Sequence, residues 1–78
     1  MSNVILPRYP IGTKVQLTPN ARVNYQYAYP EQVSAPLPLT VIRHKLKEGC
    51  NRYNVIVKDA KGNCFGRWWS EIWFEPYV

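Results

Sequence analysis

The chain has 78 residues, with ten lysines and arginines against five acidic residues, a formal net charge of +5 and a pI near 9.5. A chain this short forms one domain that buries only about 60% of the surface of its unfolded form, so there is no room for a catalytic domain beside a binding domain. The positive charge favours an acidic partner, such as nucleic acid or an acidic protein face; the alternative is that it only keeps the protein soluble.

The N-terminal segment, residues 1–10, is predicted to be an arm ahead of a single domain at residues 11–78. Pro7 and Pro10 bar a regular helix or a central strand there. The segment lacks a basic stretch followed by a long apolar run, and nothing in the chain approaches the roughly 20 apolar residues that span a bilayer. We therefore expect a cytoplasmic protein without a membrane partner.

Residues 13–18 predict the first strand, because Val15 and Leu17 alternate with Lys14 and Gln16. Residues 19–38 follow with four prolines and no sustained helical period, which predicts a long surface loop with a short irregular hairpin around residues 23–29. If that piece is extended, three rings share one face: Tyr25, Tyr27 and Tyr29. They either form a binding surface or cover a core too small to close itself.

Residues 38–47 predict the next strand. Uniform alternation assigns one face to Thr40, Ile42, His44 and Leu46, and the other to Leu39, Val41, Arg43, Lys45 and Lys47. The second face turns from apolar to cationic partway along, as in a strand that leaves the barrel for water. His44 is interpreted as a partly buried structural histidine.

Residues 53–69 predict a β-hairpin whose turn is DAKG at residues 59–62, with Gly62 in the left-handed conformation. A three-residue loop pairs Val57 with Phe65, Val55 with Arg67 and Tyr53 with Trp69. The core face then carries Tyr53, Val55, Val57, Phe65 and Trp69, and the opposite face carries Ile56, Cys64, Gly66 and Trp68. A register one residue away would exchange Trp68 and Trp69.

Residues 70–73 fit one tight helical turn with Ser70 as a cap, and residues 74–76 fit a last short strand. If Ile72 and Phe74 turn inward, Trp73 points outward and is a candidate partner-binding residue. The alternative is that Trp73 caps the end of the barrel.

Three segments stand in a familiar order: IGTKV at residues 11–15, residues 55–62, and WSEIWFEP at residues 69–76. With five short strands and a long first loop, they resemble the small bacterial and phage SH3-like proteins. The resemblance covers about residues 10–77 and implies an all-β, SH3-like five-stranded barrel with one 3-10 turn before the last strand. It also implies a functional surface of long first loop, hairpin loop and helical turn, here Tyr25, Tyr27, Tyr29, Trp68 and Trp73.

Residues for catalysis or metal binding are scarce. Cys50 and Cys64 are the only cysteines and His44 is the only histidine, too few for a closed zinc site of four protein ligands. No disulfide framework, catalytic triad or phosphate-binding glycine loop is indicated, and two free thiols are preferred over a bridge. We expect a protein that is not an enzyme and carries no cofactor.

The first functional hypothesis is a small protein-interaction module, an accessory subunit or inhibitor, that docks its aromatic surface on a larger, acidic protein. The alternative is a nucleic-acid-binding barrel that uses cations for phosphates. Its residues would be Arg43, Lys45, Lys47, Arg52, Lys58, Lys61 and Arg67. Self-association through exposed strand edges is a third hypothesis.

Overall fold

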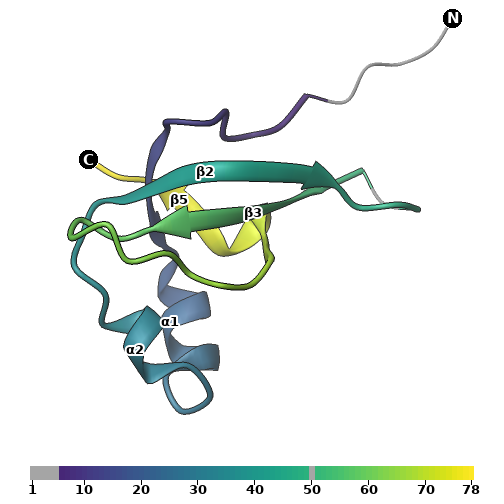
Figure 1. The fold of residues 1–78 in the computed structure, drawn as a ribbon. Coiled ribbons are helices and arrows are strands. Elements are labelled where there is room, and N and C mark those ends of the chain that lie inside the picture. The colour runs from purple at the N-terminus through teal and green to yellow at the C-terminus, as the bar shows by residue number, and fades with distance from the viewer. Residues whose placement is uncertain (1–5, 50) are drawn as a thin grey trace, which may run out of the picture.

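The computed structural model describes residues 6–49 and 51–78. Five strands form one antiparallel sheet in the order β4-β3-β2-β1-β5 (Figure 1). They are β1 (Lys14–Leu17), β2 (Leu39–Leu46), β3 (Tyr53–Lys58), β4 (Trp69–Ser70) and β5 (Phe74–Pro76). Helices α1 (Pro19–Tyr25) and α2 (Pro30–Val33) lie between β1 and β2, and the 3-10 turn η1 (Glu71–Trp73) precedes β5. The all-β fold class, the five strands and the 3-10 turn are confirmed.

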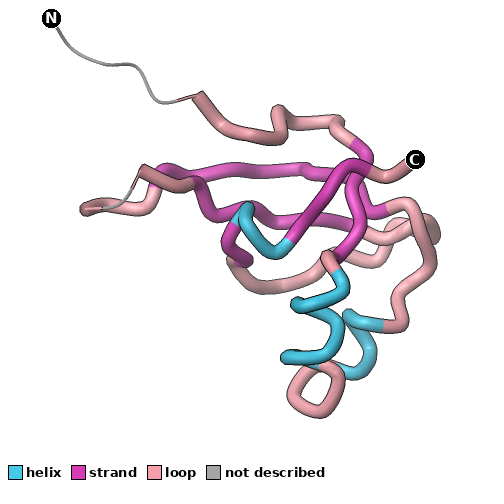
Figure 2. Tube along the Cα trace, turned by 180° about the vertical axis from the view of Figure 1, so that it is seen from behind, coloured by secondary structure: helices cyan, strands magenta, loops and turns pink. Residues whose placement is uncertain are grey.

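The sheet curls because its two edge strands are consecutive in the chain. β4 and β5 are the outermost strands, yet only the three residues of η1 separate them. The view from behind shows η1 leading directly into β5, which runs at an angle to the β2–β3 pair (Figure 2). Within the described residues no ladder joins β4 to β5, so the sheet stays open at this point. Its strand order is compatible with an SH3-like fold.

The core is built from the alternating apolar residues of these strands. Val15 and Leu17 face it from β1, as predicted, and Phe74 faces it from β5. The fully buried side chains of the other strands are Leu39 and Val41 in β2, and Val55 and Val57 in β3. Each such aliphatic side chain contributes about 1.5–3 kcal/mol when removed from water, so this small set holds the sheet together.

A β-bulge interrupts β2. Val41 pairs with Val57, but the next pair is Arg43 with Ile56, so Ile42 is an extra residue on β2. An extra residue reverses the side on which every later side chain lies. His44 therefore pairs with the buried Val55 and faces inward, while Arg43 and Lys45 face outward. The predicted uniform alternation along this strand was wrong beyond Val41.

The turn after β3 has the predicted chemistry. Gly62 has a φ of +89°, and its N–H donates to the carbonyl of Asp59 at 3.0 Å. The Asp59 carboxylate accepts from the backbone N–H groups of Lys61 and Asn63, both at 2.9 Å. Because an aspartate accepts such bonds readily and glycine tolerates positive φ, the sequence defines this turn locally.

The returning strand follows the predicted register only near the turn. Lys58 pairs with Cys64, and the N–H of Phe65 donates to the carbonyl of Val57 at 2.8 Å. Further on, Val55 pairs with Trp69 instead of Arg67, a shift of two residues. An even shift leaves the faces unchanged. Trp69 is therefore in the core, only 4% exposed, and the alternative register with Trp68 inside is excluded.

The first connection contains helices where a helix-free loop was predicted. The hydroxyl of Thr18 accepts from the N–H of Ala21 at 3.2 Å, and Pro19 occupies the first turn of α1. Pro30 likewise starts α2. A threonine cap followed by proline is a strong helix start. Ala21 is fully buried and Tyr25 packs against the core, so both side chains anchor α1.

The N-terminal segment contributes to the core before residue 11. Tyr9 is only 7% exposed, and its hydroxyl donates to the carbonyl of Phe74 at 2.9 Å. The N–H of Arg8 donates to Oε1 of the buried Glu71 at 3.1 Å. The end of the predicted arm is thus fastened across β5 and η1.

Candidate binding surface

The three tyrosines of the first connection do not share one face. Tyr25 ends α1 and Tyr29 precedes α2, and both are half-buried against the core. Their rings lie 5.8 Å apart. Tyr27, on the turn between the helices, is 89% exposed. The predicted extended alternation was wrong because helical backbone places residues 25 and 29, four apart, on one side and residue 27 on another.

An aromatic cluster, which we define as Tyr25, Tyr29, Trp69 and Trp73, closes one end of the core. Tyr25 makes edge-to-face contacts with Trp69 at 5.2 Å and with Trp73 at 5.3 Å between ring centroids. Tyr29 contacts Trp69 at 5.5 Å. Edge-to-face pairs contribute about 0.5–1.5 kcal/mol beyond their buried area. Tyr25, Tyr29 and Trp73 thus cover the core, the alternative that the sequence left open for them.

A hollow of about 310 Å³ lies beside this cluster. Besides the cluster itself, it is lined by Lys47, Asn54, Arg67, Trp68 and Ser70. The guanidinium of Arg67 lies over the ring of Tyr29, 4.3 Å from its centroid. We call this feature the aromatic hollow. Its volume is at the lower limit of the roughly 300–1,000 Å³ typical of ligand sites.

The floor of the aromatic end carries an unmatched donor. Trp69 is almost completely buried, and its indole Nε1–H has no hydrogen-bond partner among the residues that the structure describes. An unmatched buried donor costs about 1–3 kcal/mol. The fold keeps Trp69 in place through its ring contacts, which include Phe65 at 6.3 Å and Phe74 at 6.4 Å.

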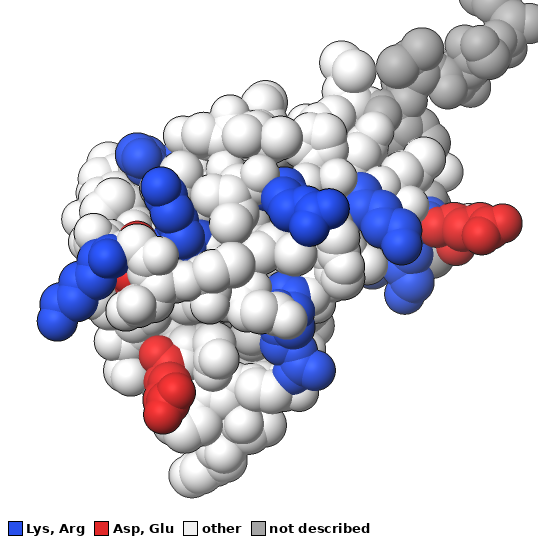
Figure 3. Space-filling model, in the orientation of Figure 1, with Lys and Arg blue, Asp and Glu red and all other residues white. Residues whose placement is uncertain are grey.

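The outward side of β2 and β3, which we call the outer face, is basic. The bulge directs Arg43 and Lys45 to this side, opposite Ile56 and Asn54. Neither strand contains an acidic residue. In the space-filling view, lysine and arginine side chains are spread over the face that β2 and β3 present, and acidic side chains lie near its borders (Figure 3).

Trp68 lies on the outer face beside both of these cations. Its ring centroid is 5.7 Å from the guanidinium carbon of Arg43 and 6.0 Å from Nζ of Lys45. The side chain remains 38% exposed. A cation over an indole contributes about 0.5–1 kcal/mol at an exposed site. Two cations from β2 therefore contact an accessible tryptophan that directly precedes β4.

The other predicted cations are divided between two places. Lys47 and Arg67 line the aromatic hollow, and Arg52 follows in the exposed turn after β2, where its carbonyl accepts from the N–H of Lys47 at 2.9 Å. Lys58 and Lys61 lie at the opposite end of β3. The seven cations named as candidates for nucleic-acid binding therefore lie in two groups, one near Trp68 and one around the residue 59–62 turn.

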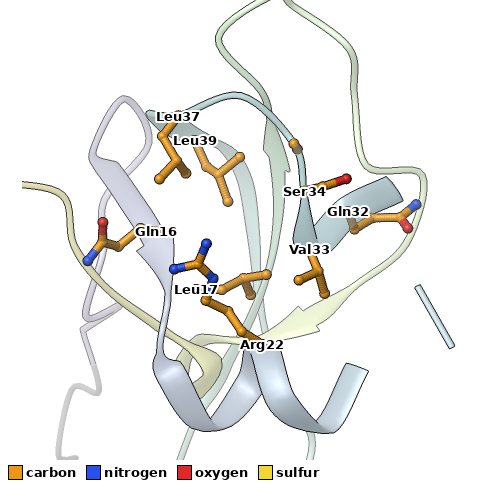
Figure 4. Close-up of a pocket in the computed structure, with 9 residues that line it drawn as sticks. Gln16, Leu17, Arg22, Gln32, Val33, Ser34, Leu37 and Leu39 are labelled. Carbon is orange, nitrogen blue, oxygen red and sulfur yellow. The ribbon is translucent and has the colours of Figure 1, made fainter. Parts of the chain in front are cut away.

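A smaller hollow of about 70 Å³ lies between the two helices and the start of the sheet (Figure 4). Arg22 extends from α1 into the space between Gln16 and Leu39 (Figure 4). The remaining lining comes from Leu17, Gln32, Val33, Ser34, Ala35 and Leu37. This volume is far below the roughly 300 Å³ of the smallest typical ligand pockets, so we interpret it as loose packing between α2 and the sheet.

Residues considered for catalysis or metal binding are dispersed. His44 contacts the ring of Tyr53 edge-to-face at 5.3 Å. Cys64 is an exposed free thiol, and Cys50 lies outside the described residues. Across residues 6–49 and 51–78, no three metal-ligating side chains come together. No helix in the same part of the chain is long and apolar enough to cross a membrane.

Comparison with known proteins yields no relative: no family model, no curated protein and no solved structure matches this chain.

Proposed function

We propose that the protein is a non-catalytic interaction module that binds an acidic segment of a larger protein. The observation that carries the proposal is Trp68, an exposed indole in contact with both Arg43 and Lys45 on the outer face. Tryptophan and arginine dominate the binding energy of protein interfaces. Arg43 and Lys45 lie in β2 and Trp68 directly precedes β4, so the sheet positions all three before a partner binds, and preorganisation of this kind lowers the entropy lost on binding.

The aromatic hollow supports the same role from the adjoining side. Trp68 borders both the outer face and the hollow, where Lys47 and Arg67 add two more cations. An acidic segment that crosses Trp68 would meet cations on both sides of the ring. Trp73 and Tyr25 would act by shaping the wall of the hollow, whereas Tyr27 stands apart from it.

The SH3-like assignment belongs with this proposal. In such barrels the long first loop, the hairpin and the helical turn surround the functional surface. The corresponding parts here, α1 with the start of α2, the segment before β4, and η1, supply Tyr25, Tyr29, Trp68 and Trp73 to one hollow. The proposed partner would be a larger cytoplasmic protein for which this chain serves as accessory subunit or inhibitor.

The test is capture of partners by the tagged protein from nuclease-treated lysate of its own host, followed by affinity measurement with the purified partner. Trp68→Ala is expected to weaken binding about 30-fold, which corresponds to a hot spot of about 2 kcal/mol. Tyr27→Ala, which removes a more exposed ring elsewhere, is the matched control and should bind normally. Equal loss in both variants, or none in Trp68→Ala, would refute the proposal.

Nucleic-acid binding is the second candidate, because Arg43 and Lys45 share the outer face with Lys58 and no acidic residue on β2 or β3 offsets them. The placement of the cations over the indole argues against it, since a base could stack on that side of Trp68 only by displacing them. Anisotropy of a labelled single-stranded oligonucleotide distinguishes the candidates. Binding that falls steeply with salt and is lost in the Arg43→Ala, Lys45→Ala double variant would favour nucleic acid.

A further inference from the structure

Three lysines gather at the end of the outer face that is farther from Trp68. Lys14 pairs with Thr40 on the neighbouring strand, and Thr40 pairs with Lys58 on the next. Lys14, Thr40 and Lys58 thus form one row across β1, β2 and β3. Lys61, in the turn that follows β3, borders the same place.

The row borders a hollow of about 410 Å³, lined by Lys14, Pro38, Thr40, Lys58, Asp59, Ala60, Lys61 and Gly62. We call it the lysine hollow. Adjacent strands lie about 4.8 Å apart, so the Cα atoms of Lys14 and Lys58 are about 10 Å apart and their long side chains can converge on one group.

The side chains in the lysine hollow are arranged to donate hydrogen bonds. Nζ of Lys14 donates to Oγ1 of Thr40 at 2.9 Å, which uses the hydroxyl as an acceptor and leaves its proton for another acceptor. The hollow contains one acid, Asp59, which is only 6% exposed. Its carboxylate already accepts two backbone N–H bonds and one from the Asn63 side chain at 3.3 Å.

The charge of the lysine hollow is therefore about two positive units, from three lysines and one aspartate that is committed to its turn. Like charges on a sheet face repel each other, and a bound anion of charge −2 would remove that repulsion. A phosphate group has this charge near neutral pH and three oxygens that accept strong hydrogen bonds. A carboxylate, with one charge, would match only half of it.

We propose that the lysine hollow is a phosphate-binding site, in which Lys14, Lys58 and Lys61 contact the phosphate oxygens and the Thr40 hydroxyl donates to one of them. The phosphate belongs to a monoester, as in a phosphorylated side chain or metabolite, because a nucleic-acid diester, like a carboxylate, carries only one negative charge. This site is separate from the Trp68 surface and does not depend on the function proposed for it, because no residue that lines the lysine hollow also lines the aromatic hollow.

The proposal is tested by nuclear magnetic resonance titration of the full chain at constant ionic strength, with sodium phosphate replacing sodium chloride. Saturable shifts are expected at the amides of Thr40 and Gly62, with none at Trp68. Lys58→Ala should weaken phosphate binding about tenfold, the loss of a charge-assisted bond of at least about 1.4 kcal/mol. Lys47→Ala, which removes a lysine from the aromatic hollow, is the matched control and should bind as the parent does.

Separate titrations with O-phosphoserine and dimethyl phosphate identify the source. Tighter binding of O-phosphoserine than of dimethyl phosphate is expected for a site that takes dianionic monoesters, and equal binding of the two would contradict that assignment. Shifts no larger than those produced by chloride would overturn the proposal, as would equal losses in Lys58→Ala and Lys47→Ala. A Thr40→Val variant keeps the size of the side chain and tests the hydroxyl, and a threefold weaker affinity is expected.

Discussion

Trp68 and Trp69 are neighbours in the sequence but belong to two regions of opposite character. Trp69 is 4% exposed and contacts Tyr25, Tyr29, Phe65 and Phe74 at the aromatic end of the core. Trp68 is 38% exposed and contacts two cations on the outer face. One position along an extended backbone separates a core residue from a surface residue, because successive side chains point to opposite faces.

This difference shows that the aromatic residues of the chain have two different roles. Four rings close a core that a domain of this size cannot close with aliphatic side chains alone. The ring of Trp68 has no such role, since its contacts are with Arg43 and Lys45, which are themselves exposed. The surface proposed for binding is therefore best tested by comparing the two tryptophans.

The largest effect is expected from Trp69→Ala. Removing a buried aromatic side chain costs about 3–5 kcal/mol, which is a large share of the stability of a small domain. Urea unfolding monitored by far-UV circular dichroism should show the midpoint falling to near zero denaturant. Trp69→Phe, which also removes the unmatched Nε1–H, should retain a cooperative transition. A small loss in Trp69→Ala would contradict the assignment of this residue to the core.

A smaller loss of stability is expected from Tyr9→Phe. The substitution deletes the bond from the Tyr9 hydroxyl to the carbonyl of Phe74 and leaves that carbonyl without its donor. The expected cost is about 1 kcal/mol. Tyr27→Phe deletes a hydroxyl from a side chain that is 89% exposed and should change the unfolding free energy by less than the error of the measurement. Equal values for the two variants would show that Tyr9 is not docked as described.

Acid should weaken the turn at the end of the outer face. Burial acts to raise the pKa of Asp59, but the hydrogen bonds from Asn63, Lys61 and Gly62 outweigh it, and the net effect lowers the pKa below its usual value of 3.8. Because the folded state holds the proton more weakly than the unfolded state, this stabilisation is present above that value and is lost as the pH falls through the folded pKa.

Asp59→Asn should therefore lose less stability than the parent between pH 5 and about pH 2.5, in urea unfolding at each pH. Glu31→Gln, which removes one exposed carboxylate, controls for the change in net charge. If the two variants followed the same pH profile, the contribution of Asp59 would not come from its turn.

Much of the fold could be predicted from the sequence, because alternation of apolar and polar residues is a local signal. Val15 with Leu17, and Val55 with Val57, identify their strands, and Asp59 with Gly62 identifies the turn. The bulge in β2 also left a trace: the inward residues change from odd to even positions after Val41, which is what one inserted residue produces. Uniform alternation instead suggested a strand that leaves the barrel.

Other features depend on contacts that the sequence does not show. The register shift between Phe65 and Trp69 involves two residues. It therefore leaves the alternation of inward and outward residues unchanged, and the sequence pattern does not reveal it. The helices are seven and four residues long, too short for a helical period, although Thr18 and Pro19 do form a helix start. The contact of Trp68 with Arg43 depends on two features that the sequence prediction missed. The bulge determines the face of β2 on which Arg43 lies, and the register shift determines where Trp68 lies along β3.

The smallest effect on stability, and the most informative for function, is expected from Trp68→Ala. Its losses are two exposed cation contacts, so the unfolding free energy should fall by less than about 1 kcal/mol. A double-mutant cycle with Arg43→Ala should give a coupling of about 0.5 kcal/mol. Together with a large loss of partner binding, this result would mean that Trp68 serves binding and not folding. If Trp68→Ala were as destabilising as Trp69→Ala, weaker binding would only reflect unfolding. That result would contradict the assignment of the outer face as the binding surface.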